Sequence, residues 1–312
     1  MTIFQRTIKH PIEVSGIGLH SGNNVMLKLL PAPANTGIIF RRVDLNPVVE
    51  VKADPYLVRE TTLCTGIVTD EGVRIQTIEH LMAAISSFGI DNLYIELNSP
   101  EVPIMDGSSA AFVLLFQDAG LIQLDQPKQF FRITKKVRVE DGDKFAELLP
   151  SESNIFNLDF TIDFNHPAFS KDLSHYNMDL TTNNFVNQLS RCRTFGFLKD
   201  IEYLQQNGLC RGGSLANAIV LDENRIINEE GLRYNNEFVR HKMLDAIGDL
   251  FLCGHNIIGN YKAFKSGHHL NNQLVRKLIA ENAFEVVTFE GLSVKEKTEL
   301  RENVVRDNKV HA

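Results

Sequence analysis

The sequence predicts an α+β protein of two similar domains, each a β-sheet layered with α-helices. Short stretches of alternating apolar and polar residues, separated by Gly and Pro, indicate strands. Fewer, longer stretches with apolar residues at i, i+3 and i+4 spacing indicate helices. A faint internal repeat indicates two domains, because Ile78-Glu-His80 and Val239-Arg-His241 each open a helix that leads to a strand, a turn containing glycine and a second helix.

Length and composition are those of a globular protein. The 312 residues suffice for one large or two ordinary domains, and the 43% hydrophobic and 23% charged residues are ordinary values. A net charge of -7 argues against nucleic-acid binding, which requires a basic surface. The N-terminus lacks the apolar stretch of a signal peptide, and no apolar run is long enough to span a bilayer, so we expect a cytoplasmic protein without membrane insertion. Four cysteines without a C-x-x-C pair indicate free thiols.

The first predicted domain comprises residues 1–126. A helix that ends near Gly89 would have Thr77 as its N-cap, and a second helix, 110–119, would be stopped by Gly120. The polar, proline-containing stretch from Asp125 to Lys128 breaks the pattern and predicts the domain boundary. Strands are predicted at 25–30, 36–40 and 92–97.

The second predicted domain comprises residues 127–312. Its charged tail, 294–312, is expected to be mobile. Strands are predicted at 130–134, 136–139, 144–149, 157–163 and 255–258, and helices at 201–206, 238–253 and 270–282.

The helix predicted at 238–253 combines a broad apolar face with a polar stripe. His241, Asp245 and Asp249 are four residues apart and therefore lie above one another on one side. The simpler interpretation is a His–Asp pair on the helix surface, since such i, i+4 pairs are common. The alternative is a metal site, because buried carboxylates are costly unless they are paired or bind an ion.

Residues elsewhere in the chain favour the metal site. His80, His241 and Asp245 would supply three ligands, and a fourth position left to water is typical of catalytic zinc. Glu79, next to a proposed ligand, would take a proton from that water. A cationic His268, paired with Asp249, would protonate a leaving amine or stabilise an oxyanion.

Each of these residues also has a simpler interpretation. His80 alone is more often a satisfied core or surface histidine. Spacing does not distinguish His268 from the adjacent His269. Cys64 is by default a buried thiol rather than a nucleophile.

Several motifs, spread over the chain up to about His269, closely resemble those of the bacterial UDP-3-O-acyl-N-acetylglucosamine deacetylases. That family performs the zinc-dependent committed step of lipid A biosynthesis. The sequence diverges mainly beyond Ala280. The matching segments are Thr61-Thr-Leu-Cys64, Thr77-Ile-Glu-His80, Ile104-Met-Asp-Gly107, Asp163-Phe-Asn-His-Pro167, Arg193-Thr-Phe-Gly-Phe197, residues 238–249 and Lys265-Ser-Gly-His268.

The resemblance implies a role for each matching residue. The metal ligands would be His80, His241 and Asp245, holding Zn²⁺ or, in the cell, Fe²⁺. The remaining catalytic residues would be Glu79 as general base, His268 as general acid or electrostatic partner, Asp249 as its orienting carboxylate and Thr194 as oxyanion donor. Substrate-binding positions would be Lys242, Phe164, Phe195, Asp200 and Lys144, with Cys64 as a thiol beside the metal.

The resemblance also implies a wider picture of the protein. Each domain would carry a small insert, the active site would lie at the domain interface, and the insert at 195–219 would form an apolar passage for the acyl chain. The partner would be an acylated UDP-sugar, and the protein would be a monomer. The alternatives are a zinc amidase acting on a different N-acetyl sugar and a non-catalytic sugar-nucleotide sensor.

Overall fold

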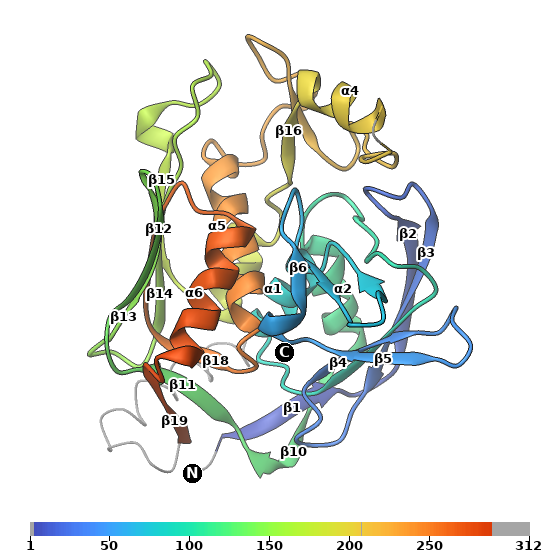
Figure 1. Ribbon diagram of the computed structural model, residues 1–312, viewed down its shortest axis with the longest axis vertical. Coiled ribbons are helices and arrows are strands. Elements are labelled where there is room, and N and C mark those ends of the chain that lie inside the picture. Colours follow the sequence, from blue (N-terminus) through green and yellow to red (C-terminus); the bar gives the residue numbers. More distant parts are fainter. Residues whose placement is uncertain (1–2, 207, 289–312) are drawn as a thin grey trace.

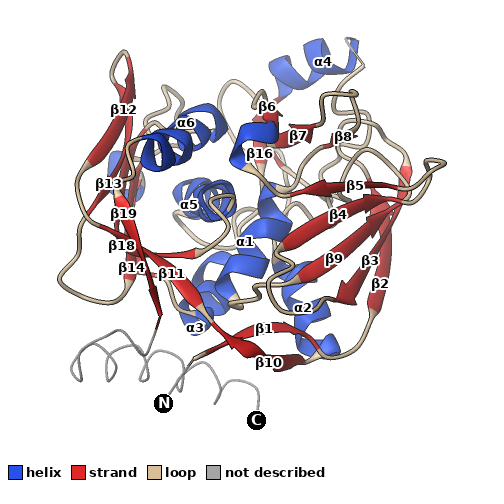
Figure 2. Ribbon diagram, turned by 60° about the horizontal axis from the view of Figure 1, so that its bottom comes forward, coloured by secondary structure: helices blue, strands red, loops and turns tan. Residues whose placement is uncertain are grey.

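The computed structural model describes residues 3–206 and 208–288 and shows a mixed α/β protein. Two sheets form the outer layers, and the main helices lie between them (Figures 1 and 2). We call residues 3–127 the first half and residues 128–288 the second half. The tail that was expected to be mobile, 294–312, lies outside the described residues.

The first half contains a five-stranded sheet of order β2-β3-β9-β4-β5 and a small three-stranded sheet of order β6-β7-β8. Its helices are α1 (Glu79–Ser87) and α2 (Ala110–Ala119), with the short 3-10 turn η1 (Pro55–Leu57). The strands are β1 (Phe4–Ile8), β2 (Ile12–Ile17), β3 (Asn24–Pro31), β4 (Ile38–Arg42), β5 (Val49–Lys52), β6 (Val58–Glu60), β7 (Gly66–Val68), β8 (Arg74–Ile75), β9 (Leu93–Leu97) and β10 (Leu121–Pro127).

The second half contains a seven-stranded sheet and a two-stranded sheet, β16-β17. Its helices are α3 (Thr182–Asn184), α4 (Leu198–Gln206), α5 (Glu237–Phe251) and α6 (His268–Ala280), with short turns η2 (Lys171–Leu173) and η3 (Phe185–Leu189). The strands are β11 (Gln129–Ile133), β12 (Val137–Asp141), β13 (Lys144–Leu149), β14 (Phe156–Thr161), β15 (His175–Asp179), β16 (Phe195–Phe197), β17 (Ile219–Leu221), β18 (Asn256–Phe264) and β19 (Phe284–Thr288).

The two large sheets share a pairing pattern. In the first half, β9 lies between β3, which is antiparallel to it, and β4, which is parallel. In the second half, β18 lies between antiparallel β13 and parallel β14. Each of these central strands follows a buried helix, α1 or α5, as the internal repeat of the sequence predicts.

Helices α1 and α5 form the centre of the molecule and make the most extensive contact between any two described elements (Figure 2). Every residue of α1 is buried, and in α5 only Arg240 and Lys242 are not. The helices can approach closely because residue 248 is a glycine. A Cβ atom there would lie 2.0 Å from the carbonyl oxygen of Glu79. This contact brings the first turn of α1 against the polar stripe of α5.

Most predicted elements are present, including the helices at α2, α4, α5 and α6. The N-cap prediction at Thr77 is wrong: α1 begins at Glu79 after Ile78, and Thr77 has a left-handed φ of 58°. Its hydroxyl donates instead to Glu101 at 3.0 Å. Residues from Asp125 to Pro127 belong to β10, which pairs with β1, and the domain boundary at this stretch stays a prediction.

None of the helices within residues 3–206 and 208–288 is both long enough and apolar enough to cross a bilayer.

The glycine contact predicts an unusual effect of alanine. Gly→Ala in an open helix position stabilises a protein by up to about 1 kcal/mol. Gly248→Ala is expected instead to lower the free energy of unfolding by about 3 kcal/mol, because its methyl group would overlap backbone atoms of α1. Gly267→Ala is the control, since a Cβ there meets nothing within 4 Å. Denaturant unfolding measures both, and an unchanged midpoint for Gly248→Ala would contradict the close contact.

Candidate metal centre

Three buried side chains from the two halves meet where α1 faces α5. His80 comes from the first turn of α1, and His241 and Asp245 are one turn apart on α5. Asp245 Oδ1 lies 3.4 Å from His80 Nε2 and 3.3 Å from His241 Nε2. The potential ligand atoms of the three residues lie within 4.8 Å of one another. We call this group the ligand cluster.

The donor atoms of the ligand cluster fit a divalent cation. Asp245 Oδ2 accepts a hydrogen bond from Lys242 Nζ at 2.8 Å, whereas the buried Oδ1, which lies near both imidazoles, has no hydrogen-bond partner within the described part of the chain. A buried carboxylate oxygen without a donor is unusual in a folded protein. Two imidazole nitrogens and one carboxylate oxygen form a donor set typical of Zn²⁺. A cation bound by these three donor atoms would satisfy the unpaired Asp245 Oδ1.

The protonation states of two of the three residues in the ligand cluster suit metal binding, whereas the pKa of His80, which burial alone would lower, is raised by Asp245. Burial lowers the pKa of His241 to about 3, so its ring is neutral at pH 7. Its Nδ1 lies 3.1 Å from the backbone oxygen of Cys192, which fixes a tautomer with the Nε2 lone pair directed toward Asp245. Burial would raise the pKa of Asp245, but His241 and Lys242 hold it well below its usual range.

Glu79 and His268 face each other beside the ligand cluster. Glu79 is the first residue of α1 and is only 3% exposed. Its Oε2 accepts a hydrogen bond from the Thr65 backbone N–H at 3.0 Å, and its Oε1 lies 4.0 Å from His268 Nε2. Burial raises the pKa of Glu79, which makes the carboxylate a stronger base.

His268 is paired with Asp249, as the sequence predicts. The Nδ1–Oδ2 distance is 2.9 Å, and both side chains are buried. Burial alone would lower the pKa of His268, but the charge and hydrogen bond of Asp249 raise it to about 9. The ring is therefore cationic at pH 7. His269 is exposed and contacts Gln273, whereas His268 is buried and faces Glu79.

An aromatic cluster adjoins the ligand cluster. The Phe195 ring lies 6.3 Å from the His241 ring and 5.6 Å from the Phe164 ring. Thr194, which precedes β16, is partly exposed, and its backbone N–H donates to the oxygen of Gly107 at 2.8 Å. Two of the predicted substrate residues, Phe164 from a loop and Phe195 from β16, are thus brought together next to a predicted ligand.

The other predicted residues are more dispersed. Asp200 is exposed on α4, and Lys144 is exposed at the first residue of β13, whereas the ligand cluster is buried. Cys64 is buried beside Glu79, and burial together with that carboxylate raises its pKa well above the usual value. Its thiol is therefore protonated.

The residues that surround Asp249 are not among those predicted from the sequence. Thr65 Oγ1 donates to Asp249 Oδ1 at 2.5 Å, and Asn271 Nδ2 donates to Asp249 Oδ2 at 2.9 Å. Asn271 Oδ1 in turn accepts from Tyr261 and Ser266. One signal was available: Asn271 is three residues after His268, a spacing that places two side chains on one face of a helix.

Comparison with known proteins identifies the family. Residues 5–280 match the family model described as UDP-3-O-acyl N-acetylglycosamine deacetylase. The chain is 61% identical to a UDP-3-O-acyl-N-acetylglucosamine deacetylase from Actinobacillus succinogenes and 61% identical to one from Haemophilus ducreyi, in each case over 92% of this chain and 94% of the relative. A relative of the same name from Haemophilus influenzae is 59% identical over the same shares. The chain belongs to the UDP-3-O-acyl N-acetylglycosamine deacetylase family.

Proposed function

We propose that this protein is a cytoplasmic, metal-dependent deacetylase that hydrolyses the N-acetyl group of UDP-3-O-acyl-N-acetylglucosamine. The products are acetate and the free glucosamine amine, and the reaction is the committed step of lipid A biosynthesis. The observation that carries the proposal is the position of Glu79 and cationic His268, 4.0 Å apart beside the ligand cluster, in a chain of this family. A base and an acid on opposite sides of one small space are what amide hydrolysis requires.

His80, His241 and Asp245 hold the metal in this proposal. Zn²⁺ is the family expectation, and Fe²⁺ suits the same donors. When bound, the ion lowers the pKa of a water and polarises a carbonyl group. The unpaired Asp245 Oδ1 supports its role as a ligand.

The proton transfers involve the other side chains. Glu79 takes a proton from the water that attacks the acetamide carbonyl carbon, and a C–O bond forms there. The Thr194 hydroxyl and the His268 Nε2–H donate hydrogen bonds to the oxyanion of the tetrahedral intermediate. The C–N bond then breaks, and the amine leaves with a proton supplied by His268. Asp249, at 2.9 Å from Nδ1, keeps the imidazole cationic and oriented.

Substrate contacts are assigned to residues around this space. Lys242 Nζ uses one of its three donors on Asp245, and the remaining two would bind phosphate. Phe164 would lie against the uracil base, and Phe195 would line the apolar passage. Asp200 and Lys144 are assigned to the outer part of the substrate, and Cys64 to a position beside the metal without coordinating it.

We also infer that the protein is a monomer of two related domains, 1–126 and 127–312, with the active site between them. Each would carry a small insert: β6–β8 in the first domain, and β16, β17 and α4 in the second. The equivalent pairing of β9 and β18 supports this division.

Metal removal tests the centre itself. Exhaustive chelation is expected to abolish acetate release, and added Zn²⁺ or Fe²⁺ to restore it, because the proposed reaction depends on an ion that lowers the pKa of the attacking water. His241→Ala is expected to lower the metal content of the purified protein strongly, whereas His175→Ala, on an exposed strand residue, leaves it unchanged. Metal analysis and acetate release measure both effects. Undiminished turnover by the fully chelated enzyme would reject the mechanism.

Glu79→Gln tests the general base. The substitution retains the shape of the side chain and is expected to lower kcat about 10²- to 10⁴-fold, which is the usual contribution of a general base. Metal content and unfolding midpoint should stay near those of the wild type. Glu96→Gln on β9, where Glu96 pairs with Arg41, is a control that should retain activity. Wild-type kcat in Glu79→Gln would exclude this role.

A substrate panel tests the assigned substrate. The proposed function requires turnover of the acylated UDP-sugar and a large loss of kcat/KM when either the UDP group or the 3-O-acyl chain is absent. Equal turnover of a simple N-acetyl sugar would indicate an amidase of different specificity. Binding of the acylated UDP-sugar without acetate release would indicate a sensor.

A further inference from the structure

We propose that Thr65 is a positioning residue that sets the separation of Glu79 from the His268–Asp249 pair. The proposal rests on the proposed function and deepens it. Thr65 directly precedes β7, in the first half, and is only 2% exposed. In the described hydrogen bonds it contacts none of the three proposed metal ligands, but it contacts the proposed base, Glu79, and Asp249, the carboxylate that orients the proposed acid.

Every polar group of Thr65 has a partner in the active-site region. Its N–H donates to Glu79 Oε2 at 3.0 Å, and its hydroxyl donates to Asp249 Oδ1 at 2.5 Å. Its carbonyl oxygen accepts from the N–H of Ile78, the residue that caps α1, at 3.2 Å. One residue therefore fixes the beginning of α1, the carboxylate of the base and the carboxylate that orients the acid.

The Thr65 hydroxyl has a function that the other donors to Asp249 do not share. His268 Nδ1 and Asn271 Nδ2 both contact Oδ2, and both residues belong to α6. Among the described residues, Thr65 supplies the hydrogen bond to Oδ1 and so links Asp249 to the first half. Without this hydrogen bond, Asp249 Oδ1 would be a buried acceptor without a donor. The hydrogen bonds from α6 would still hold Asp249, but they would not fix its position relative to Glu79.

This link determines a catalytic distance. Glu79 Oε1 and His268 Nε2 are 4.0 Å apart and come from different halves of the molecule. Catalysis depends steeply on such separations, and a displacement of about 1 Å can lower a rate about 10²-fold. Loss of the hydroxyl should therefore affect kcat, because proton transfer is misaligned, and leave KM nearly unchanged, because the proposed substrate contacts are elsewhere.

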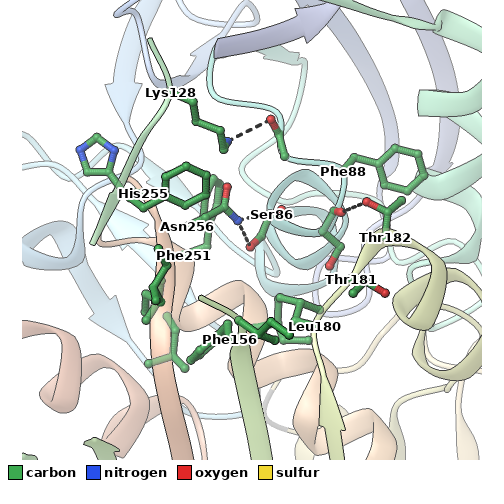
Figure 3. Close-up of a pocket in the computed structure, with 18 of the residues that line it drawn as sticks. Ser86, Phe88, Lys128, Phe156, Leu180, Thr181, Thr182, Phe251, His255 and Asn256 are labelled. Atoms are coloured by element: carbon green, nitrogen blue, oxygen red, sulfur yellow. Dashed lines mark hydrogen bonds between the residues drawn. The ribbon is translucent and has the colours of Figure 1, made fainter. Parts of the chain in front are cut away.

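The chain offers a matched control at the other end of α1. The hydroxyl of buried Thr182, in the second half, donates to the carbonyl oxygen of Ser87 at 2.5 Å (Figure 3). This bond also joins the two halves through a buried threonine. It lies beside a cavity lined by Ser86, Phe88 and Phe251 and involves none of the proposed catalytic residues.

The experiment compares Thr65→Val, Thr65→Ser and Thr182→Val. For each we would measure metal content, unfolding midpoint, and kcat and KM for acetate release from the acylated UDP-sugar. Thr65→Val is expected to lower kcat about 10- to 100-fold with KM within about threefold and full metal content. Thr65→Ser, which retains the hydroxyl, should restore kcat to within a few-fold. Thr182→Val should lose similar stability and keep the wild-type kcat.

Several outcomes would overturn the proposal. These are a wild-type kcat in Thr65→Val, an equal loss of kcat in Thr182→Val, or no recovery in Thr65→Ser. Thr65→Ala replaces Thr65→Val if the valine variant does not fold. A crystal structure of the variant adds a readout that does not depend on activity. An unchanged 4.0 Å separation of Glu79 and His268 in that structure would refute the positioning role. Failure of the wild-type protein to release acetate would instead refute the proposed function alone.

Discussion

The structure depends on how closely α1 and α5 approach each other. A glycine at position 248 allows the helix backbone to lie against the carbonyl of Glu79, and no larger residue fits there without displacing α1. This contact places one imidazole from the first half opposite an imidazole and a carboxylate from the second half. The two rings have centroids 5.0 Å apart although they are separated by more than half of the chain. The metal centre is thus a product of helix packing.

Burial of so many ionisable groups opposes folding unless each is satisfied. Burial raises the pKa of Glu79, and isolated buried carboxylates are costly. Hydrogen bonds to the carboxylates offset this cost. Asp249 accepts hydrogen bonds from Thr65, His268 and Asn271, and Asp245 accepts one from Lys242. Asp245 Oδ1, beside both imidazoles, is a buried oxygen without a donor among the described residues. An ion bound between the imidazoles would satisfy it.

Sequence patterns predicted the parts of this arrangement that depend on local spacing. The stripe of His241, Asp245 and Asp249 follows from helical geometry, and its burial follows from the apolar residues around it. Thr77 was misassigned because its backbone adopts a left-handed conformation that the pattern of a capping threonine does not indicate. The role of Thr65 could not be predicted, because its hydroxyl bonds to a residue 184 positions away, and no periodicity connects two such distant positions.

The hydrogen bond from His241 to the backbone of Cys192 has a consequence for how specificity can change within the family. Cys192 is three residues before β16, the strand that leads into the proposed acyl-chain passage. Its hydrogen bond therefore connects the beginning of that strand to an imidazole of the ligand cluster. A substitution that shifts this strand also rotates that ring. Changes in the proposed acyl-chain passage that move this strand would therefore act on the ligand cluster as well.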